Sequence, residues 1–156
     1  MTDDVRWLDS TEQRAWRGLL ALHAQLAARL NRDLQRTSGL SLSDYDVLVQ
    51  LTDVADGRLR VLELGEALQW GKTRVSKQVS RMAGRDLVAK EECAEDRRGA
   101  YVVLTATGRR AIEQAAPAHV ELVRQIVFDV LTPRQVRELA TITRTVLDRF
   151  DEQLSA

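Results

Sequence analysis

The sequence predicts a mainly α-helical protein with one small β-hairpin. Apolar residues recur every three or four positions over residues 10–36 and again over 133–150, a spacing typical of helices that bury one face. Between them, residues 87–93 and 100–104 have the composition of short strands, and the polar segment "AEDRRG" separates them. Helices therefore dominate the chain, and the two strands form a local feature of its middle.

Composition limits the class of protein. A chain of 156 residues suits one compact domain with extensions and needs no metal or disulfide to fold. The single cysteine, Cys93, excludes an internal disulfide and fits a reducing compartment. The acidic start "MTDDVRWLDS" lacks the apolar segment of a secretory signal, and no apolar run approaches the roughly 18 residues of a membrane span. We expect a cytoplasmic protein without a membrane partner.

The first helix is expected from Ser10, which can form a capping pair with Gln13. It continues to about Arg36, so it would be roughly 40 Å long, longer than a small domain is wide. Its apolar stripe consists of Trp16, Leu19, Leu20, His23, Leu26, Leu30 and Leu34. A helix that extends beyond its own domain is expected to pack on a second chain.

Three helices follow before the hairpin. Ser41 and Asp44 form a capping pair for the first of them, and residues 62–69 form a second, short helix. After a tight turn at 70–71, residues 72–86 form the third helix. Its buried stripe is predicted to be Val75, Val79 and Met82.

Two helices are expected after the hairpin. Thr105 is a suitable N-cap for the first, and Pro117 is expected to kink it or make it restart. Thr132 caps the last helix, with Pro133 at its first position and Gln135 closing the capping box. The apolar face of the last helix is predicted to contain Val136, Leu139, Ile142, Val146, Leu147 and Phe150.

Positive charge is concentrated in the middle of the chain, whose overall net charge is zero. Residues 58–110 carry 12 basic and 7 acidic side chains, a net charge of +5, whereas residues 1–57 and 111–156 have net charges of −3 and −2. A basic segment between acidic flanks indicates a local site for a polyanion.

The order of the elements gives that site a geometry. A short helix, a tight turn and a polar-faced helix, followed by a hairpin, form a helix-turn-helix with a two-stranded wing. The major groove of DNA accepts one α-helix that displays donors outward, where Arg can bind guanine and Gln can bind adenine. The candidate DNA-binding residues of the recognition helix are Lys72, Thr73, Arg74, Ser76, Lys77, Gln78 and Arg81.

The tip of the hairpin holds Arg97 and Arg98 side by side. An arginine there can enter the neighbouring minor groove, whose negative potential attracts it. Asp96 can orient one guanidinium through a two-pronged pair, and Gly99 lets the backbone turn sharply. These four residues are the candidate DNA contacts of the wing.

The segment "DRRGAYVVLTATG" resembles the wing signature of the MarR family of winged helix-turn-helix regulators, Asp-x-Arg followed by x-Leu-Thr-x-x-Gly. "LELGEAL", "KTRVSKQVSRM" and "DLV" resemble that family's short helix, recognition helix and strand entry. The resemblance implies dimerisation helices at 1–37 and 109–156 around a DNA-binding domain at 38–108. It further implies a homodimer on a palindromic operator of double-stranded DNA, often a repressor released by a small ligand or an oxidant.

Three positions depart from the family pattern. Leu62 replaces a polar cap of the short helix, which would leave its first amides without a side-chain acceptor. Gln69 and Asp86 stand where glycines are common, and Gly84 lies in the last helical turn instead. Asp tolerates a left-handed backbone better than most residues, so the turn at position 86 is expected to survive.

Other readings stay open. A winged helix can serve as a protein–protein contact module, although the basic face favours DNA. Cys93 could make the regulator redox-responsive, but neighbouring carboxylates disfavour its thiolate. Trp16 and His23 are weak candidates for an effector site, and His23 and His119 have no second metal ligand at helical spacing. No catalytic, metal-binding or cofactor motif is present, so we expect no enzyme and no cofactor.

Overall fold

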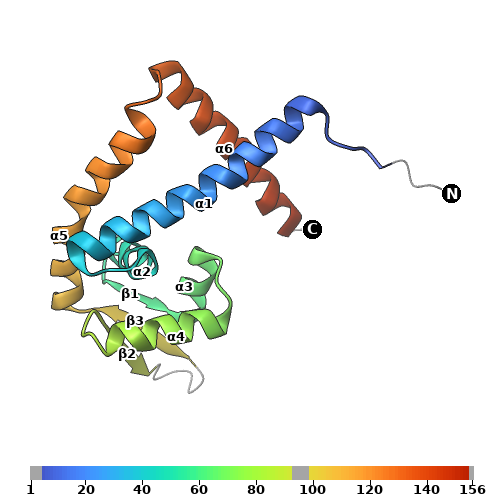
Figure 1. Cartoon of the computed structure of the whole chain (residues 1–156). Helices are drawn as coiled ribbons and strands as arrows, with labels where there is room; N and C mark the ends of the chain where they lie inside the picture. Colours follow the sequence, from blue (N-terminus) through green and yellow to red (C-terminus); the bar gives the residue numbers. More distant parts are fainter. Residues whose placement is uncertain (1–4, 93–98, 155–156) are drawn as a thin grey trace. The chain divides into compact units, whose positions relative to one another are not determined.

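The computed structural model describes residues 5–92 and 99–154, which fall in two units, Met1–Ala116 and Pro117–Ala156 (Figure 1). The first unit contains α1 (Ser10–Ser38), α2 (Leu42–Thr52), β1 (Arg58–Arg60), α3 (Val61–Leu68), α4 (Lys72–Ala83), β2 (Val88–Glu92) and β3 (Ala100–Leu104). The helix α5 (Ala106–Val123) crosses the boundary, and a π-helical turn (Arg124–Phe128) and α6 (Pro133–Leu154) follow. The mainly α-helical fold class is confirmed, whereas the division at 37 and 108 stays a prediction.

The start of α1 differs from the expected one by one residue. Asp9, not Ser10, is the N-cap: its Oδ1 accepts from the backbone N–H groups of Thr11 and Glu12 at 2.7 and 2.8 Å. The Glu12 carboxylate accepts from the Asp9 N–H at 2.8 Å and closes the capping box. A carboxylate at each end of the box also interacts well with the positive helix N-terminus, which explains why this pair is preferred over Ser10 and Gln13.

The core of the first unit forms around α2. Val47, Leu48 and Leu51 on this helix are completely buried. They pack with fully buried apolar residues from the neighbouring helices and strands, namely Leu64, Val75, Val79, Met82 and Val102. The predicted stripe of α4 is confirmed, and it faces this core.

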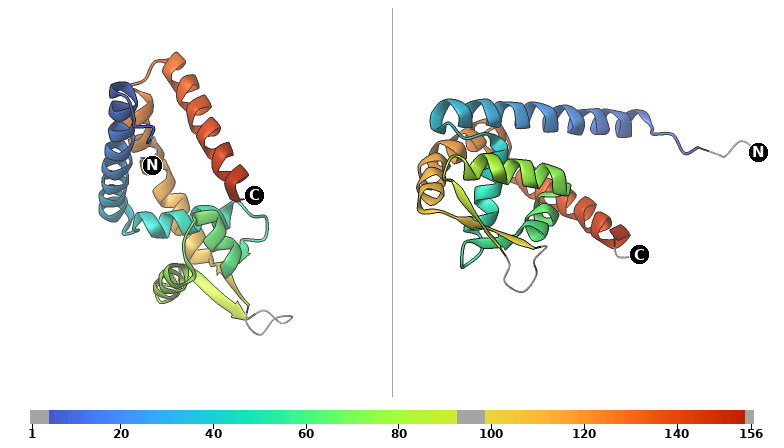
Figure 2. Two further views of the ribbon diagram at one scale, coloured as in Figure 1. Left: turned by 90° about the vertical axis from the view of Figure 1, so that its right-hand side faces the viewer. Right: turned by 90° about the horizontal axis from the view of Figure 1, so that it is seen from below.

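The sheet has three strands rather than the expected two, in the antiparallel order β1-β3-β2. The pairing of β2 with β3 places Val88 opposite Leu104 and Glu92 opposite Ala100. The additional strand, β1, pairs Leu59 with Val102. With three residues it is too short to show a recognisable alternation, so pattern analysis missed it. In Figure 2 the ends of β2 and β3 extend away from the helices of this unit.

The segment between α4 and β2 contains a strained turn. Asp86 has a left-handed backbone with φ of 57°, so the turn expected at this position is present. Its side chain accepts from the Thr107 hydroxyl at 2.9 Å, and its carbonyl accepts from the Thr105 hydroxyl. The same Thr105 hydroxyl accepts from the N–H of Gly108 at 2.9 Å, which confirms Thr105 as the cap of α5. The end of α4 and the start of α5 are thereby held together.

Pro117 does not make α5 restart, because the helix runs through it to Val123. Proline removes one backbone hydrogen bond, and here the carbonyl that loses it belongs to the exposed Glu113, where water can replace the donor. The cap of α6 is as expected. Thr132 Oγ1 accepts from the N–H of Gln135 at 3.3 Å, and the Gln135 side chain accepts from the N–H of Thr132 at 2.9 Å. None of the helices in the described ranges has the length and hydropathy of a membrane span.

Gly108 is predicted to be irreplaceable at the start of α5. A Cβ there would overlap the carbonyl oxygen of Leu87 and lie 3.0 Å from Leu104 Cδ1. We expect Gly108→Ala to lower the free energy of unfolding by at least about 1–3 kcal/mol, the usual effect of overpacking, as measured by urea denaturation. Gly84→Ala is the matched control, because its Cβ would meet only ordinary contacts of 3.5 Å or more. Equal stability of the two variants would contradict the prediction that only glycine fits at position 108.

Candidate nucleic-acid interface

The turn between α3 and α4 sets the angle of the helix-turn-helix. Gln69 ends α3 with a left-handed backbone at φ of 53°, and the N–H of Trp70 donates to the carbonyl of Gly65 at 2.8 Å. A side chain at Gly65 would lie 3.1 Å from the Trp70 carbonyl and 3.3 Å from Val75. Absence of a side chain at this position lets the two helices approach closely.

The start of α3 also differs from expectation. The helix begins at Val61 with Arg60 as N-cap, so Leu62 lies in its first turn and is 71% exposed. The carboxylate of Glu63 accepts from the N–H of Arg60 at 2.8 Å. Glu63 therefore satisfies the amide of the N-cap residue, whereas no N-cap side chain accepts from the first amides of the helix, as the sequence pattern predicted.

One face of α4 is polar and exposed. Its Val75, Val79 and Met82 are at most 1% exposed and anchor the helix on the core. Within the described part of the chain, Lys72, Lys77 and Arg81 form no ion pair with a carboxylate. The predicted recognition residues that the structure places on this exposed face are Lys72, Thr73, Arg74, Ser76, Lys77 and Arg81.

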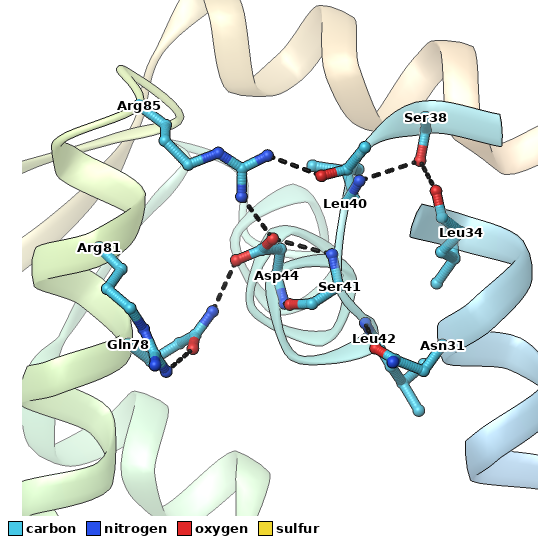
Figure 3. Close-up of polar contacts among 11 residues, drawn as sticks. Asn31, Leu34, Ser38, Leu40, Ser41, Leu42, Asp44, Gln78, Arg81 and Arg85 are labelled. Atoms are coloured by element: carbon cyan, nitrogen blue, oxygen red, sulfur yellow. Dashed lines mark hydrogen bonds and ion pairs between the residues drawn. The ribbon is translucent and has the colours of Figure 1, made fainter. Parts of the chain in front are cut away.

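Gln78 does not belong to that face. It is only 3% exposed, its Nε2 donates to Asp44 Oδ1 at 2.7 Å, and its Oε1 accepts from Arg81 Nη2 at 2.7 Å (Figure 3). The expectation that its amide reads a base from the helix surface is therefore not supported. Position 78 follows Val75 by three and precedes Val79 by one, so helical periodicity already places it on the buried stripe.

Arg74 is held against an aromatic ring. Its guanidinium carbon lies 4.0 Å from the centre of the Trp70 ring, a cation–π arrangement. Arg74 also interacts electrostatically with Asp46 on α2. Burial raises the pKa of Asp46, and the positive charge of Arg74 offsets part of this increase. The stacked guanidinium keeps its planar donors at the start of the recognition helix.

The wing strands are linked to α4 and carry further arginines. Lys90 Nζ on β2 donates to Ser80 Oγ on α4 at 2.6 Å. On β1, the guanidinium carbons of Arg58 and Arg60 lie 4.0 and 5.6 Å from the centre of the Tyr101 ring. Arg58 also pairs with Glu91 at 3.4 Å. Sequence analysis did not single out these arginines, because β1 itself was not recognised.

The tip of the predicted wing lies outside the described residues. Asp96, Arg97 and Arg98 belong to the segment 93–98, as does Cys93. Gly99 is described and lies directly before β3, where it is half-buried. The proposed roles of these residues stay predictions.

Asp44 was predicted only as a capping residue, and the structure gives it a second role. Its Oδ2 accepts from the N–H of Ser41 at 2.9 Å, as the capping box requires, and from Arg85 Nη1 at 2.7 Å. Its Oδ1 accepts from Gln78. No sequence pattern indicates contacts between residues more than thirty positions apart, so this part of the interface could not be predicted.

Trp16 and His23, the weak candidates for an effector site, both lie on α1. Trp16 is 52% exposed and His23 is also exposed on α1, so an effector role for either stays a prediction. Across the described ranges, 5–92 and 99–154, no group of three or more His, Cys, Asp or Glu side chains is arranged to hold a metal ion.

A helix-turn-helix with an exposed cationic helix, followed by a hairpin in a three-stranded antiparallel sheet, defines a winged helix-turn-helix protein. Residues 38–99 match a family model described as MarR family. The structure of AbsC, a MarR family transcriptional regulator from Streptomyces coelicolor, is similar with a TM-score of 0.87 and 37% identity, covering 95% of this chain and 99% of that one. The chain therefore belongs to the MarR family of transcriptional regulators.

Two further relatives support this assignment. Sco3205, a MarR family regulator from the same organism, was solved in complex with DNA. It has a TM-score of 0.88 and 37% identity, and the match covers 94% of this chain and 92% of that one. Transcriptional repressor MprA of Escherichia coli K12 is 23% identical over 134 residues, 85% of this chain and 76% of the relative. These relatives are regulators rather than enzymes.

Asp46 is predicted to weaken the fold at neutral pH. Since burial raises its pKa, the folded state binds this proton more tightly than the unfolded state does. The stabilising effect of protonation is complete at low pH and is lost as the pH rises through the folded-state pKa. We expect Asp46→Asn to raise the urea midpoint at pH 7, and the gain to shrink towards pH 4. A gain of the same size at both pH values would contradict this prediction.

Proposed function

We propose that this regulator binds double-stranded DNA in a sequence-specific manner, with α4 in the major groove and the wing in the adjacent minor groove. The observation that supports this most directly is the division of α4 into a buried apolar stripe and an exposed cationic face, where Lys72 and Lys77 form no ion pair with a carboxylate of the described residues. The complex of Sco3205 with DNA supports the same function. Such a regulator would act in the cytoplasm, in the same compartment as the DNA that it binds.

The cations of the exposed face are suited to different contacts. Arg74, stacked on Trp70, presents a planar set of donors of the kind that binds guanine O6 and N7. Lys72 and Lys77 are flexible point charges, which suit phosphates. Bases would therefore be read by a rigid arginine, while lysines set the register on the backbone.

The wing would complete the contact. Arg97 and Arg98 would enter the minor groove, with Asp96 orienting one of them and Gly99 allowing the turn. Arg58 and Arg60, stacked around Tyr101, add arginines beside the same hairpin, although Glu91 pairs with Arg58. This concentration of charge would make binding strongly dependent on salt.

We further propose a homodimer on a palindromic operator. The apolar side of α1 exposes Trp16 and Leu19 at 52% and 56%, and α6 exposes Ile142 and Leu147 at 60% and 57%. Long helices with unburied apolar stripes indicate a protein surface that covers them. A second copy of the chain would do so and would place two recognition helices about 34–36 Å apart, one turn of DNA.

Repression with release by a small-molecule effector is the mode of regulation we propose, because MprA is a repressor. Trp16 and His23 remain the candidates for the effector site. Redox control through Cys93 and a winged helix that contacts only proteins are the alternatives. A protein-binding module would expose apolar residues on α4, yet its exposed residues are polar or charged, which favours DNA.

The DNA proposal is tested by fluorescence anisotropy with the duplex directly upstream of the gene and a scrambled duplex. We expect sequence-dependent binding that falls by about 10³–10⁵ between 50 and 200 mM salt, the dependence of six to ten phosphate contacts. Arg74→Ala should lose about 1–3 kcal/mol on the upstream duplex only, and Arg98→Ala should weaken binding to both duplexes.

The control for these variants is Arg134→Ala on α6, whose guanidinium pairs with Glu138 at 2.7 Å. It should bind DNA as the parent does. Absence of binding to either duplex at low salt would overturn the DNA proposal and favour the protein-contact alternative.

The dimer proposal predicts that a charge in the stripe of α6 separates the subunits. Leu147→Glu would bury a carboxylate in the interface, so we expect the dimer dissociation constant to rise by more than about 100-fold, as measured by analytical ultracentrifugation. Thr141→Glu, also exposed on α6, is the matched control, because it adds the same single negative charge. A dimer that survives Leu147→Glu unchanged would place the interface elsewhere.

A further inference from the structure

Three side chains form a hydrogen-bonded chain from the core to the exposed face of α4 (Figure 3). Asp44 is 4% exposed and Gln78 is 3% exposed, so the first two members are buried. Arg81, the third, is exposed. Both links measure 2.7 Å, one from Gln78 Nε2 to Asp44 and one from Arg81 Nη2 to Gln78 Oε1. Direct contact of DNA with α4 does not by itself explain this buried chain.

The chemistry of Asp44 fixes the direction of the chain. An ionised carboxylate only accepts hydrogen bonds, and its Oδ2 is occupied by the Ser41 N–H and Arg85 Nη1 at 2.9 and 2.7 Å. The remaining oxygen, Oδ1, requires a donor, so the amide of Gln78 must turn its NH₂ group inward. Its carbonyl oxygen then necessarily faces Arg81.

The consequence for Arg81 is a restricted guanidinium. A free arginine side chain has about 2 kcal/mol of rotamer entropy to lose on binding. Gln78 engages one of its five N–H groups and leaves the others for an acceptor on DNA. A guanidinium that is already oriented loses less entropy when it binds.

We propose that Gln78 is a positioning residue for DNA binding: the carboxylate of Asp44 sets the orientation of the Gln78 amide, and this amide holds Arg81 in the direction in which it contacts DNA. Gln78 itself touches no base. The inference rests on the proposed DNA-binding function and assigns a role to a residue that sequence analysis placed among the base contacts.

Asp44→Asn tests the direction of the chain. The new amide at position 44 keeps one oxygen for Ser41 and Arg85 and turns an NH₂ group toward Gln78. The Gln78 amide must then flip, so that its own NH₂ group faces Arg81 and repels that donor. We expect about tenfold weaker binding to the upstream duplex, measured by anisotropy at constant salt.

A compensating substitution gives the matched rescue. In Asp44→Asn/Gln78→Glu the carboxylate moves to position 78, where it accepts from the new amide with one oxygen and from Arg81 with the other. The net charge equals that of the parent. We expect affinity to return to within about twofold of the parent, which a general loss of packing would not produce.

The parent, Asp44→Asn and the double variant Asp44→Asn/Gln78→Glu are then compared again, with Arg81→Ala added to each. If Asp44 and Gln78 act through Arg81, the three affinities become equal in this background, and Arg81→Ala alone binds about as weakly as Asp44→Asn or more weakly. Thermal unfolding of every variant is measured in parallel. Should Asp44→Asn not fold, Gln78→Met, of similar length but without the amide oxygen and NH₂ group, takes its place and its loss must also vanish with Arg81→Ala.

The outcomes separate this inference from the function on which it rests. No binding of the parent to either duplex overturns both. Binding of the parent with a failed rescue, or with a loss that persists when Arg81 is removed, overturns the positioning role alone. Unchanged affinity of Arg81→Ala does the same, because there would be no contact to position.

Discussion

The buried carboxylate of Asp44 joins three parts of the DNA-binding unit. It closes the cap of α2, accepts from Gln78 on α4 and accepts from Arg85, whose second terminal nitrogen donates to the carbonyl of Gly39 at the end of α1. A buried charge is tolerated only when its hydrogen bonds are satisfied, and removing one partner typically costs about 3–5 kcal/mol. Directional contacts at a single carboxylate, and not apolar packing alone, therefore fix how α2 meets the recognition helix.

The fold could be predicted largely because its signals are local. The cap formed by Ser41 and Asp44, the cap formed by Thr132 and Gln135, and the buried stripe of α4 each depend on residues within one or two helical turns. The errors have the same origin. Ser10 was predicted as the cap of α1 instead of Asp9, because both residue types cap helices well and they are adjacent. The strand β1 was missed because three residues are too few to show an alternating pattern.

The site could be predicted only in part, because its polar contacts join distant segments. The exposed cations of α4 follow from helical periodicity, and they lie where the pattern places them. The hydrogen-bond partner of Gln78 is Asp44, 34 residues earlier, and Arg58 stacks on Tyr101 across the sheet. The burial of Gln78 itself follows from its spacing from Val75 and Val79, and the prediction of a base contact did not take this periodicity into account.

The Leu-Thr-x-x-Gly part of the wing signature acquires a physical meaning from its contacts. The N–H of Leu104 donates to the carbonyl of Gly57 at 2.8 Å, Thr105 bonds both Asp86 and Gly108, and Gly108 leaves room for the carbonyl of Leu87. All three residues hold the ends of strands and helices together, and none needs to touch DNA. A protein with this fold that bound something other than DNA would still need Leu104, Thr105 and Gly108. This half of the signature therefore serves the architecture of the fold, and the proposed DNA contacts belong to the Asp-x-Arg half.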